Sequence, residues 1–157
     1  MSLKLLSKPP RIKVLEAIGA IGDGRIRLVG ANKAFVRSST GEKEYTVVIV
    51  KDGVDTFRVF SNDNGTIFKN YIGYPIISLL ILMGELPLDN TIAKALSGVP
   101  WKELNEKYQK YAVVENIVVS RAERLGVPRT TIDEYVNIVY KKLGLIKVYF
   151  DECLMHQ

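Results

Sequence analysis

The sequence has few of the residues that metal sites and histidine-based catalysis require. Its 157 residues include one cysteine, Cys153, and one histidine, His156. A single cysteine cannot form an intrachain disulfide, which is typical of a reducing compartment. Common zinc sites need three or four ligands at set spacings, and these two residues lie where chain ends tend to fray. We therefore expect a solvated tail there, with no metal site and no histidine-dependent catalytic set.

Long apolar runs are also missing. The longest, from Pro75 to Met83, is interrupted only by Ser78, whereas a helix that crosses a bilayer needs about 20 apolar residues. The first residues lack the apolar segment of about 7–15 residues that a signal peptide requires. The sequence therefore predicts a cytoplasmic protein without a membrane span.

What the chain does contain is ordinary for a globular domain. Hydrophobic residues make up 47% and charged residues 25%, which excludes disordered and low-complexity classes. The length suits one domain of about 100–200 residues. Two glutamines stand against fourteen lysines and ten glutamates, a bias that resembles heat-adapted proteins.

The first half of the chain, residues 1–74, begins with a helix and continues with strand patterns. Apolar residues recur at helical spacing over residues 11–21, and the glycines of residues 22–24 end that helix. Residues 25–29 then alternate charged and apolar side chains, as a half-buried strand does. The alternation predicts Arg25 and Arg27 on one face of the sheet, with residues 34–37 as a continuation.

A β-hairpin is the clearest strand signal. Residues 45–51 and 54–60 flank Asp52-Gly53, a favoured two-residue turn, which would pair Val48 with Phe57. A second turn at residues 62–65 leads to a third strand over residues 66–71. The strands together predict a meander whose apolar face needs a helical layer.

The second half supplies that layer. Glycines, prolines and capping residues divide it into segments of helical length. We expect helices over residues 75–83, 89–97, 101–125 (as one helix or two) and 130–143, and a final strand over residues 146–150. The predicted fold class is α+β, a small antiparallel β-meander packed against about five helices in a single domain over residues 1–157.

Positive charge is concentrated at the start of the sequence. The whole chain carries a formal charge of +5, and residues 1–37 alone carry +6. Lysine and arginine release counterions from phosphates, so this density is typical of polyanion binding. A solvated surface balanced by acidic residues elsewhere is the alternative. The candidate phosphate contacts are Arg11, Lys13, Arg25, Arg27, Lys33 and Arg37.

A second candidate lies in the helical half. Residues 118–137 place Ala122 where two helices would cross, followed by Leu125, a turn glycine at Gly126 and apolar Val127. This segment resembles the helix-turn-helix motif of DNA-binding regulators, with Ile132 and Tyr135 as inward residues of the second helix. The resemblance implies that Arg129 and Thr130 reach base edges in the major groove. A plain helical hairpin is the alternative interpretation.

The function that these features favour is a non-enzymatic nucleic-acid-binding protein, first of all for DNA, with the role of a transcription regulator. The alternative is a protein-interaction or structural domain that forms a homodimer through its apolar helices. Acidic residues near the hairpin also leave open a metal-dependent nuclease, but no acid-x-Lys pair supports it. We expect no catalytic residue, metal or cofactor.

Overall fold

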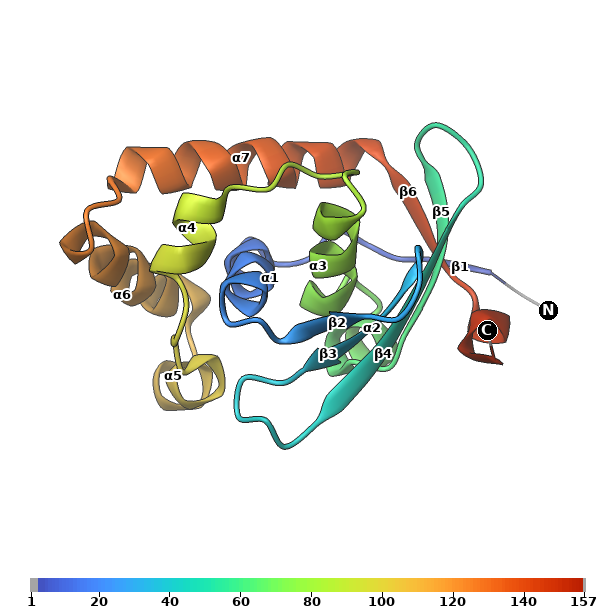
Figure 1. The fold of residues 1–157 in the computed structure, drawn as a ribbon, viewed down its shortest axis with the longest axis horizontal. Coiled ribbons are helices and arrows are strands. Elements are labelled where there is room, and N and C mark those ends of the chain that lie inside the picture. Colours follow the sequence, from blue (N-terminus) through green and yellow to red (C-terminus); the bar gives the residue numbers. More distant parts are fainter. Residues whose placement is uncertain (1–2, 157) are drawn as a thin grey trace.

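The computed structural model describes residues 3–156, and its centre is a six-stranded sheet with helices on one face (Figure 1). The strands lie in the order β1-β6-β5-β4-β3-β2. Every neighbouring pair is antiparallel except β5 and β6, which run parallel. The strands are β1 (Lys4–Leu5), β2 (Ile26–Leu28), β3 (Lys33–Arg37), β4 (Glu44–Lys51), β5 (Thr56–Ser61) and β6 (Lys147–Phe150).

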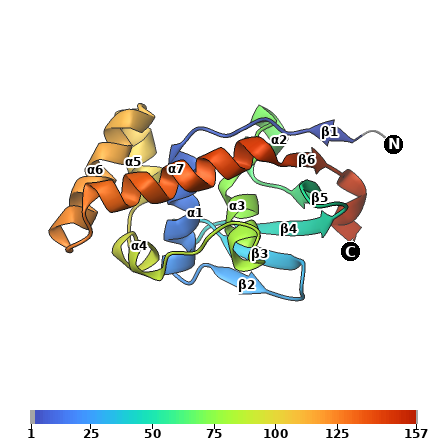
Figure 2. The same cartoon turned by 90° about the horizontal axis from the view of Figure 1, so that it is seen from above.

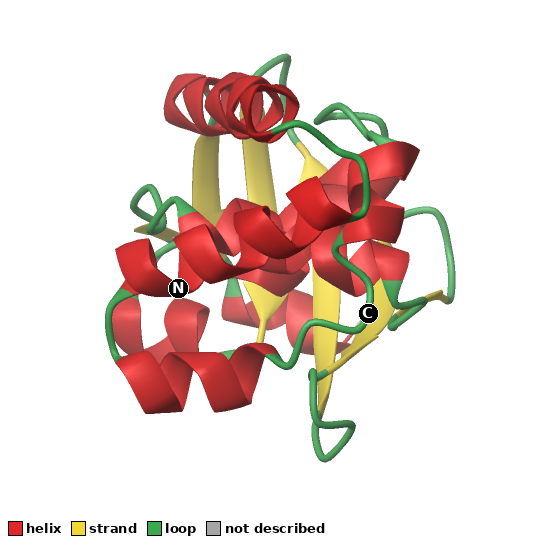
Figure 3. Cartoon of the chain, turned by 90° about the vertical axis from the view of Figure 1, so that its left-hand side faces the viewer, coloured by secondary structure: helices red, strands yellow, loops and turns green. Residues whose placement is uncertain are grey.

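Seven α-helices are present in the described residues. Helix α3 lies against the sheet, α1 packs between α3 and α4, α7 runs across α1 and α3, and α4 to α6 extend the helical layer to one side (Figure 2). Seen from that side, the helices stand in front of the strands (Figure 3). The helices are α1 (Ile12–Gly22), α2 (Asn64–Lys69), α3 (Tyr74–Leu82), α4 (Asn90–Ala95), α5 (Trp101–Tyr108), α6 (Tyr111–Arg124) and α7 (Arg129–Leu145), followed by a 3₁₀ helix, η1 (Glu152–His156).

The α+β fold class is confirmed, and its core lies between the sheet and helices α1 and α3. Leu15 and Ile18 of α1 and Ile77 and Leu80 of α3 are completely buried. The apolar run that the sequence shows around residues 75–83 is thus covered by the chain's own sheet and helices. It is central in the fold, and this run presents no broad apolar surface for a partner.

The predicted register of the hairpin is wrong. Val48 pairs with Phe60, and Phe57 pairs with Lys51. The turn is longer than Asp52-Gly53, because β5 begins only at Thr56. This register buries Phe57 against the helices, while exposed Val54 stays in the loop. The burial of apolar side chains on the core side therefore outweighed the local preference for a two-residue turn.

The predicted third strand over residues 66–71 is also wrong, because most of this segment forms helix α2. Asp63 precedes the helix, and its side chain accepts a hydrogen bond from the Thr66 backbone N–H at 3.1 Å. Helix α2 ends at Asn70, which takes a left-handed conformation with φ of 59°. An aspartate that caps a helix and one that starts a turn look alike in sequence.

The helical half follows the prediction closely. Asp89 caps α4 through the Ile92 N–H, and the segment over residues 101–125 divides into α5 and α6 at Gln109, which has φ of 53°. Helix α7 starts at Arg129, without a threonine cap, and continues past Gly144 to Leu145. The final strand joins the sheet as β6, parallel to β5.

Candidate nucleic-acid interface

The face of the sheet that points away from α1 and α3, here called the outer face, carries basic residues on β2 and β3. Side chains of a strand alternate between faces. Ala34 and Val36 of β3 are buried on the helical side, so Lys33, Phe35 and Arg37 lie on the outer face. Arg27 of β2 is directly opposite Phe35.

These four residues form one continuous group, here called the basic strip (Arg27, Lys33, Phe35 and Arg37). The Arg27 guanidinium carbon lies 4.7 Å from the centroid of the Phe35 ring, and Lys33 Nζ lies 5.8 Å from it. Both are cation–π distances. The basic strip therefore presents positive charge and an aromatic ring together.

The other half of the outer face is covered. Leu154 of η1 is buried against Val48 of β4 and Phe60 of β5. Phe60 in turn packs on Phe150 at 5.8 Å between ring centroids. η1 contacts β4 and β5, which leaves β2, β3 and the start of β4, where exposed Glu44 lies opposite Arg37, as the open part of this face.

The other three predicted phosphate contacts, Arg11, Lys13 and Arg25, are engaged on the helical side. Arg11 lies 3.3 Å from both Glu115 and Asp133, and it also donates to Asn137. Such partners neutralise the charge that phosphate binding would use. The predicted basic surface is therefore divided, and only part of it lies on the outer face.

Arg25 departs from its predicted placement beside Arg27. It precedes β2, and its side chain turns toward the helices. Its Nε donates to Asp23 at 2.9 Å and its Nη1 to the Arg37 carbonyl at 2.7 Å. The guanidinium also lies 5.8 Å from the centroid of the Tyr74 ring. The left-handed turn at Gly24, with φ of 69°, comes directly before Arg25, and β2 begins only at Ile26. The alternation of side chains along β2 therefore does not apply to Arg25.

The helix-turn-helix-like segment forms two packed helices, α6 and α7. Gly126 has φ of 94°, the left-handed region that favours glycine. Ala122 and Ile132 are completely buried and Tyr135 nearly so. This packing fits both interpretations, so the helix-turn-helix stays a prediction.

The residues expected to read bases at the start of α7 differ in their surroundings. Arg129 Nη2 contacts three side chains of α6, with distances of 3.0 Å to Asn116, 3.1 Å to Ser120 and 3.3 Å to Glu123. Thr130 is exposed. Arg129 is therefore already occupied by the preceding helix, and a DNA contact would have to compete with these bonds.

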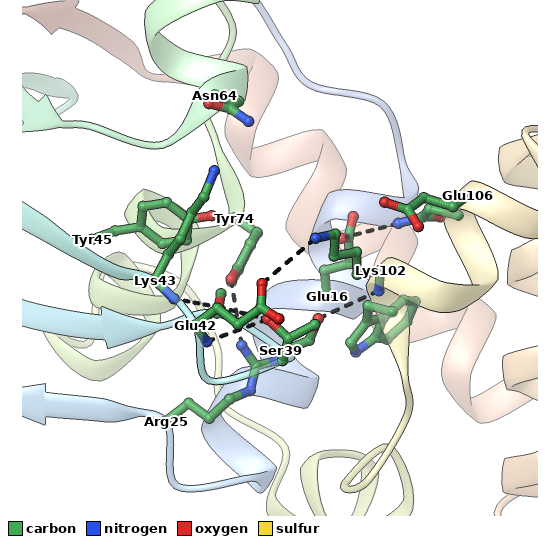
Figure 4. A pocket seen from close by; sticks show the side chains of 14 residues that line it. Glu16, Arg25, Ser39, Glu42, Lys43, Tyr45, Asn64, Tyr74, Lys102 and Glu106 are labelled. Atoms are coloured by element: carbon green, nitrogen blue, oxygen red, sulfur yellow. Dashed lines mark hydrogen bonds and ion pairs between the residues drawn. The ribbon is translucent and has the colours of Figure 1, made fainter.

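A polar cavity of about 300 Å³ adjoins the end of the basic strip. It lies between α1, α5 and the β3–β4 loop over residues 38–43 (Figure 4). Ser39 Oγ of this loop accepts a hydrogen bond from the Lys102 N–H at 3.4 Å, which joins the loop to α5. The sequence analysis did not find this cavity, because its walls come from separate parts of the chain.

Glu16 is the buried charge of this cavity. It is 5% exposed, and Lys13 Nζ lies 2.7 Å from its Oε2. Burial by itself would lower the pKa of Lys13, but the charge of Glu16, the hydrogen bond to it and the nearby Tyr71 and Tyr111 together outweigh burial, so the pKa of Lys13 lies above its ordinary value. Lys13 is thus a partner of Glu16, not an open phosphate contact.

The tyrosines around this cavity are held in their neutral form. Burial raises the pKa of Tyr74 to about 12, although nearby Arg25 acts in the opposite direction. Burial likewise raises the pKa of Tyr71, which lines an adjoining cavity, to about 12, against the effect of Lys13. Their hydroxyls can therefore donate hydrogen bonds throughout the neutral range.

Two further findings concern metals and membranes. Within residues 3–156, no three His, Cys, Asp or Glu side chains are grouped so that they could hold a metal ion. None of the helices in this range combines the length and apolar character that crossing a bilayer demands.

The fold and these surfaces define an α+β domain with an open basic sheet face beside a polar cavity. The chain belongs to the family described as Uncharacterised conserved protein UCP014422, whose model matches residues 6–149. That range includes the basic strip and the whole cavity. No curated protein and no solved structure matches the chain.

Proposed function

We propose that this protein is a non-enzymatic nucleic-acid-binding protein and that the basic strip is its contact surface. The observation that carries this proposal is the grouping of two cations, Arg27 and Lys33, around the ring of Phe35 on the open part of the outer face. Arg37 lies on the same face of β3. Among the predicted cations, Arg27, Lys33 and Arg37 share this open face, and DNA is the first ligand to test.

The chemistry of the basic strip suits a single strand. Cationic side chains follow the phosphates, and unpaired bases stack on aromatic rings or on guanidinium planes. Phe35 and Arg27 supply both kinds of stacking surface. A duplex hides its bases and would meet the cations alone, so we expect tighter binding of single-stranded than of double-stranded DNA.

The test is fluorescence anisotropy with labelled single-stranded and double-stranded DNA. Three phosphate contacts predict that affinity falls about 20- to 40-fold between about 50 and 200 mM salt. The triple variant Arg27→Ala, Lys33→Ala, Arg37→Ala should lose most of the affinity and of this salt dependence. A control with the same change of charge, Lys94→Ala, Lys141→Ala, Lys142→Ala, removes exposed lysines from α4 and α7 and should bind like the wild type.

The outcomes separate the candidate functions. No binding of either DNA at low salt would contradict the proposal. Binding that survives the triple variant but is lost with Arg129→Ala would place the contact on α7, as the helix-turn-helix resemblance implies. The predicted homodimer is tested by light scattering, since a monomer mass would contradict it.

A further inference from the structure

The polar cavity beside α1 has the dimensions and the composition of a small-molecule site. Its volume of about 300 Å³ is at the lower end of the range for ligand pockets, about 300–1,000 Å³. A second cavity of about 170 Å³ shares Tyr45, Asn64 and Tyr74 with it. The two together form a recess that reaches from α5 to α2.

Buried polar atoms without a hydrogen-bond partner are concentrated at this cavity. Three of the four in the described residues belong to residues that line it, namely Trp101 Nε1, Asn105 Oδ1 and Glu16 Oε2. Lys13 Nζ lies 2.7 Å from Glu16 Oε2, and a carboxylate oxygen has a second lone pair with which it can accept a hydrogen bond from a ligand. A buried polar atom without a hydrogen-bond partner destabilises the fold, so the concentration of such atoms at one cavity points to a ligand that completes them.

The arrangement of these atoms defines the groups that the ligand must carry. Asn105 Oδ1 and Glu16 Oε2 require donors, while the indole N–H of Trp101 requires an acceptor. A hydroxyl group both donates and accepts, and it carries no charge. Asn105 and Glu16 lie side by side, with Asn105 Nδ2 3.5 Å from Glu16 Oε1. Two neighbouring hydroxyls of a ligand can therefore donate to this pair, and a hydroxyl oxygen can accept from Trp101.

The charges around the cavity favour a neutral ligand. Glu16 is paired with Lys13, Arg25 with Asp23 at 2.9 Å, and Lys102 with Glu42 at 3.8 Å. Figure 4 shows Glu16, Glu42 and Lys102 directed toward one another across the opening. A charged ligand would have to displace one of these pairs.

We propose that this cavity binds a neutral ring compound with vicinal hydroxyls, through Glu16, Asn105 and Trp101. Trp101, Tyr45 and Tyr74 provide aromatic surfaces against which the C–H face of such a ring packs. A free monosaccharide and the ribose of a nucleoside share this chemistry. The site is distinct from the basic strip, and the proposal does not depend on nucleic-acid binding.

Trp101 provides the measurement, because it is the only tryptophan of the chain. Its fluorescence is recorded while the full-length protein is titrated with D-glucose, D-ribose, adenosine and 2′-deoxyadenosine. We expect a saturable change with at least one of the three vicinal diols and a weaker one, by at least tenfold, with 2′-deoxyadenosine. Binding of adenosine but not of the free sugars would identify a nucleoside; the reverse would identify a sugar.

Two variants test the contacts. Asn105→Ala and Glu16→Gln should each weaken binding at least tenfold, and Glu103→Gln, an exposed residue of the same helix as Asn105, should not. Circular dichroism checks that the variants fold, and Asn105→Ala keeps the test valid if Glu16→Gln does not. The proposal is wrong if none of the vicinal diols gives a saturable change, or if Asn105→Ala and loss of the 2′-hydroxyl both leave binding unaltered.

Discussion

Phe35 is the residue at which charge and stacking meet in the basic strip. It lies in the middle of β3, with Arg27 opposite it and the cation of Lys33 within 5.8 Å of its ring centroid. Neither the charge count nor the predicted strand over residues 34–37 singled it out. The usable signal was the alternation of cation, aromatic ring and cation at residues 33, 35 and 37, which places all three on one face.

Replacing Phe35 by alanine tests its stacking role separately from the charges. Base–aromatic stacking contributes about 1–3 kcal/mol per base, so Phe35→Ala should weaken single-stranded DNA binding by roughly five- to 100-fold. The effect on duplex DNA and on the salt dependence should be small. Anisotropy with both DNAs measures this, and Phe68→Ala, which removes a 75% exposed ring from α2, is the control. Equal losses in both variants would contradict a specific role of Phe35.

The raised pKa of Tyr74 predicts that the protein loses stability at alkaline pH. Burial raises its pKa to about 12 in the folded protein, from 10.0 for the ordinary group. Above pH 10 the unfolded chain therefore releases a proton that the folded chain keeps, so stability is lost as the pH rises from about 10 to 12.

For one group this loss amounts to about 2 kcal/mol by pH 11.5 and to less than about 3 kcal/mol in all, from about 1.4 kcal/mol per pKa unit. Urea denaturation between pH 8 and pH 11.5 measures the loss. Tyr74→Phe should be less sensitive to pH over this range, whereas Tyr108→Phe, at a 37% exposed position, should behave like the wild type. An unchanged slope in Tyr74→Phe would show that other groups cause the loss.

At the scale of elements, the helices marked by caps and apolar periodicity were predictable from the sequence, whereas the pairing of the strands was not. The signals for α1, α3 and α4 are local, because each depends on residues within a few positions of one another. The hairpin register depends on which side chains the helices cover. Phe57 is buried on the face of the sheet that α3 covers, information that residues 45–60 do not contain.

The start of α2 offers a direct test of a buried cap. Asp63 is 5% exposed and accepts hydrogen bonds from Thr66 N–H and from the hydroxyls of Thr66 and Ser61. Asp89, which caps α4, is more exposed and accepts one from Ile92 N–H. Loss of a cap costs about 1 kcal/mol, and buried partners left unsatisfied add about 1–3 kcal/mol.

We therefore expect Asp63→Ala to lower the free energy of unfolding by about 2–4 kcal/mol and Asp89→Ala by about 1 kcal/mol. Chemical denaturation of both variants measures the difference. Equal effects would mean that the hydroxyl contacts of Asp63 add nothing to the cap.

At the scale of the whole molecule, η1 decides which half of the outer face stays open. Leu154 is 1% exposed and completes a small cluster with Val48 and Phe60. The sequence analysis expected this end of the chain to be a solvated tail, and that expectation is wrong for Leu154, although Cys153 is exposed. Covering these apolar residues confines the open surface to β2 and β3.

Leu154→Ala should lower the free energy of unfolding by about 2–3 kcal/mol, since buried leucine-to-alanine changes cost about 2–5 kcal/mol and this cluster is small. Met155→Ala, at a 45% exposed position, should have little effect. DNA affinity should be unchanged in both variants, because the basic strip is on the other half of the face. Thermal unfolding measures the change in stability, and fluorescence anisotropy measures the DNA affinity. A loss of DNA affinity in Leu154→Ala would show that η1 contributes to the interface.

The sequence by itself determined the fold class, most of the helices and the excess of positive charge near the N-terminus, because periodicity, capping and composition are local properties. Only the tertiary structure decided which of these cations lie on the helical side and which lie on the outer face of the sheet. Arg11 is paired with Glu115 and Asp133, and Lys13 with Glu16, whereas the cations of the basic strip are on the open face. The packing of sheet and helices brings residues from distant parts of the chain together, and these contacts decide which cations pair with acidic residues on the helical side and which lie on the outer face of the sheet.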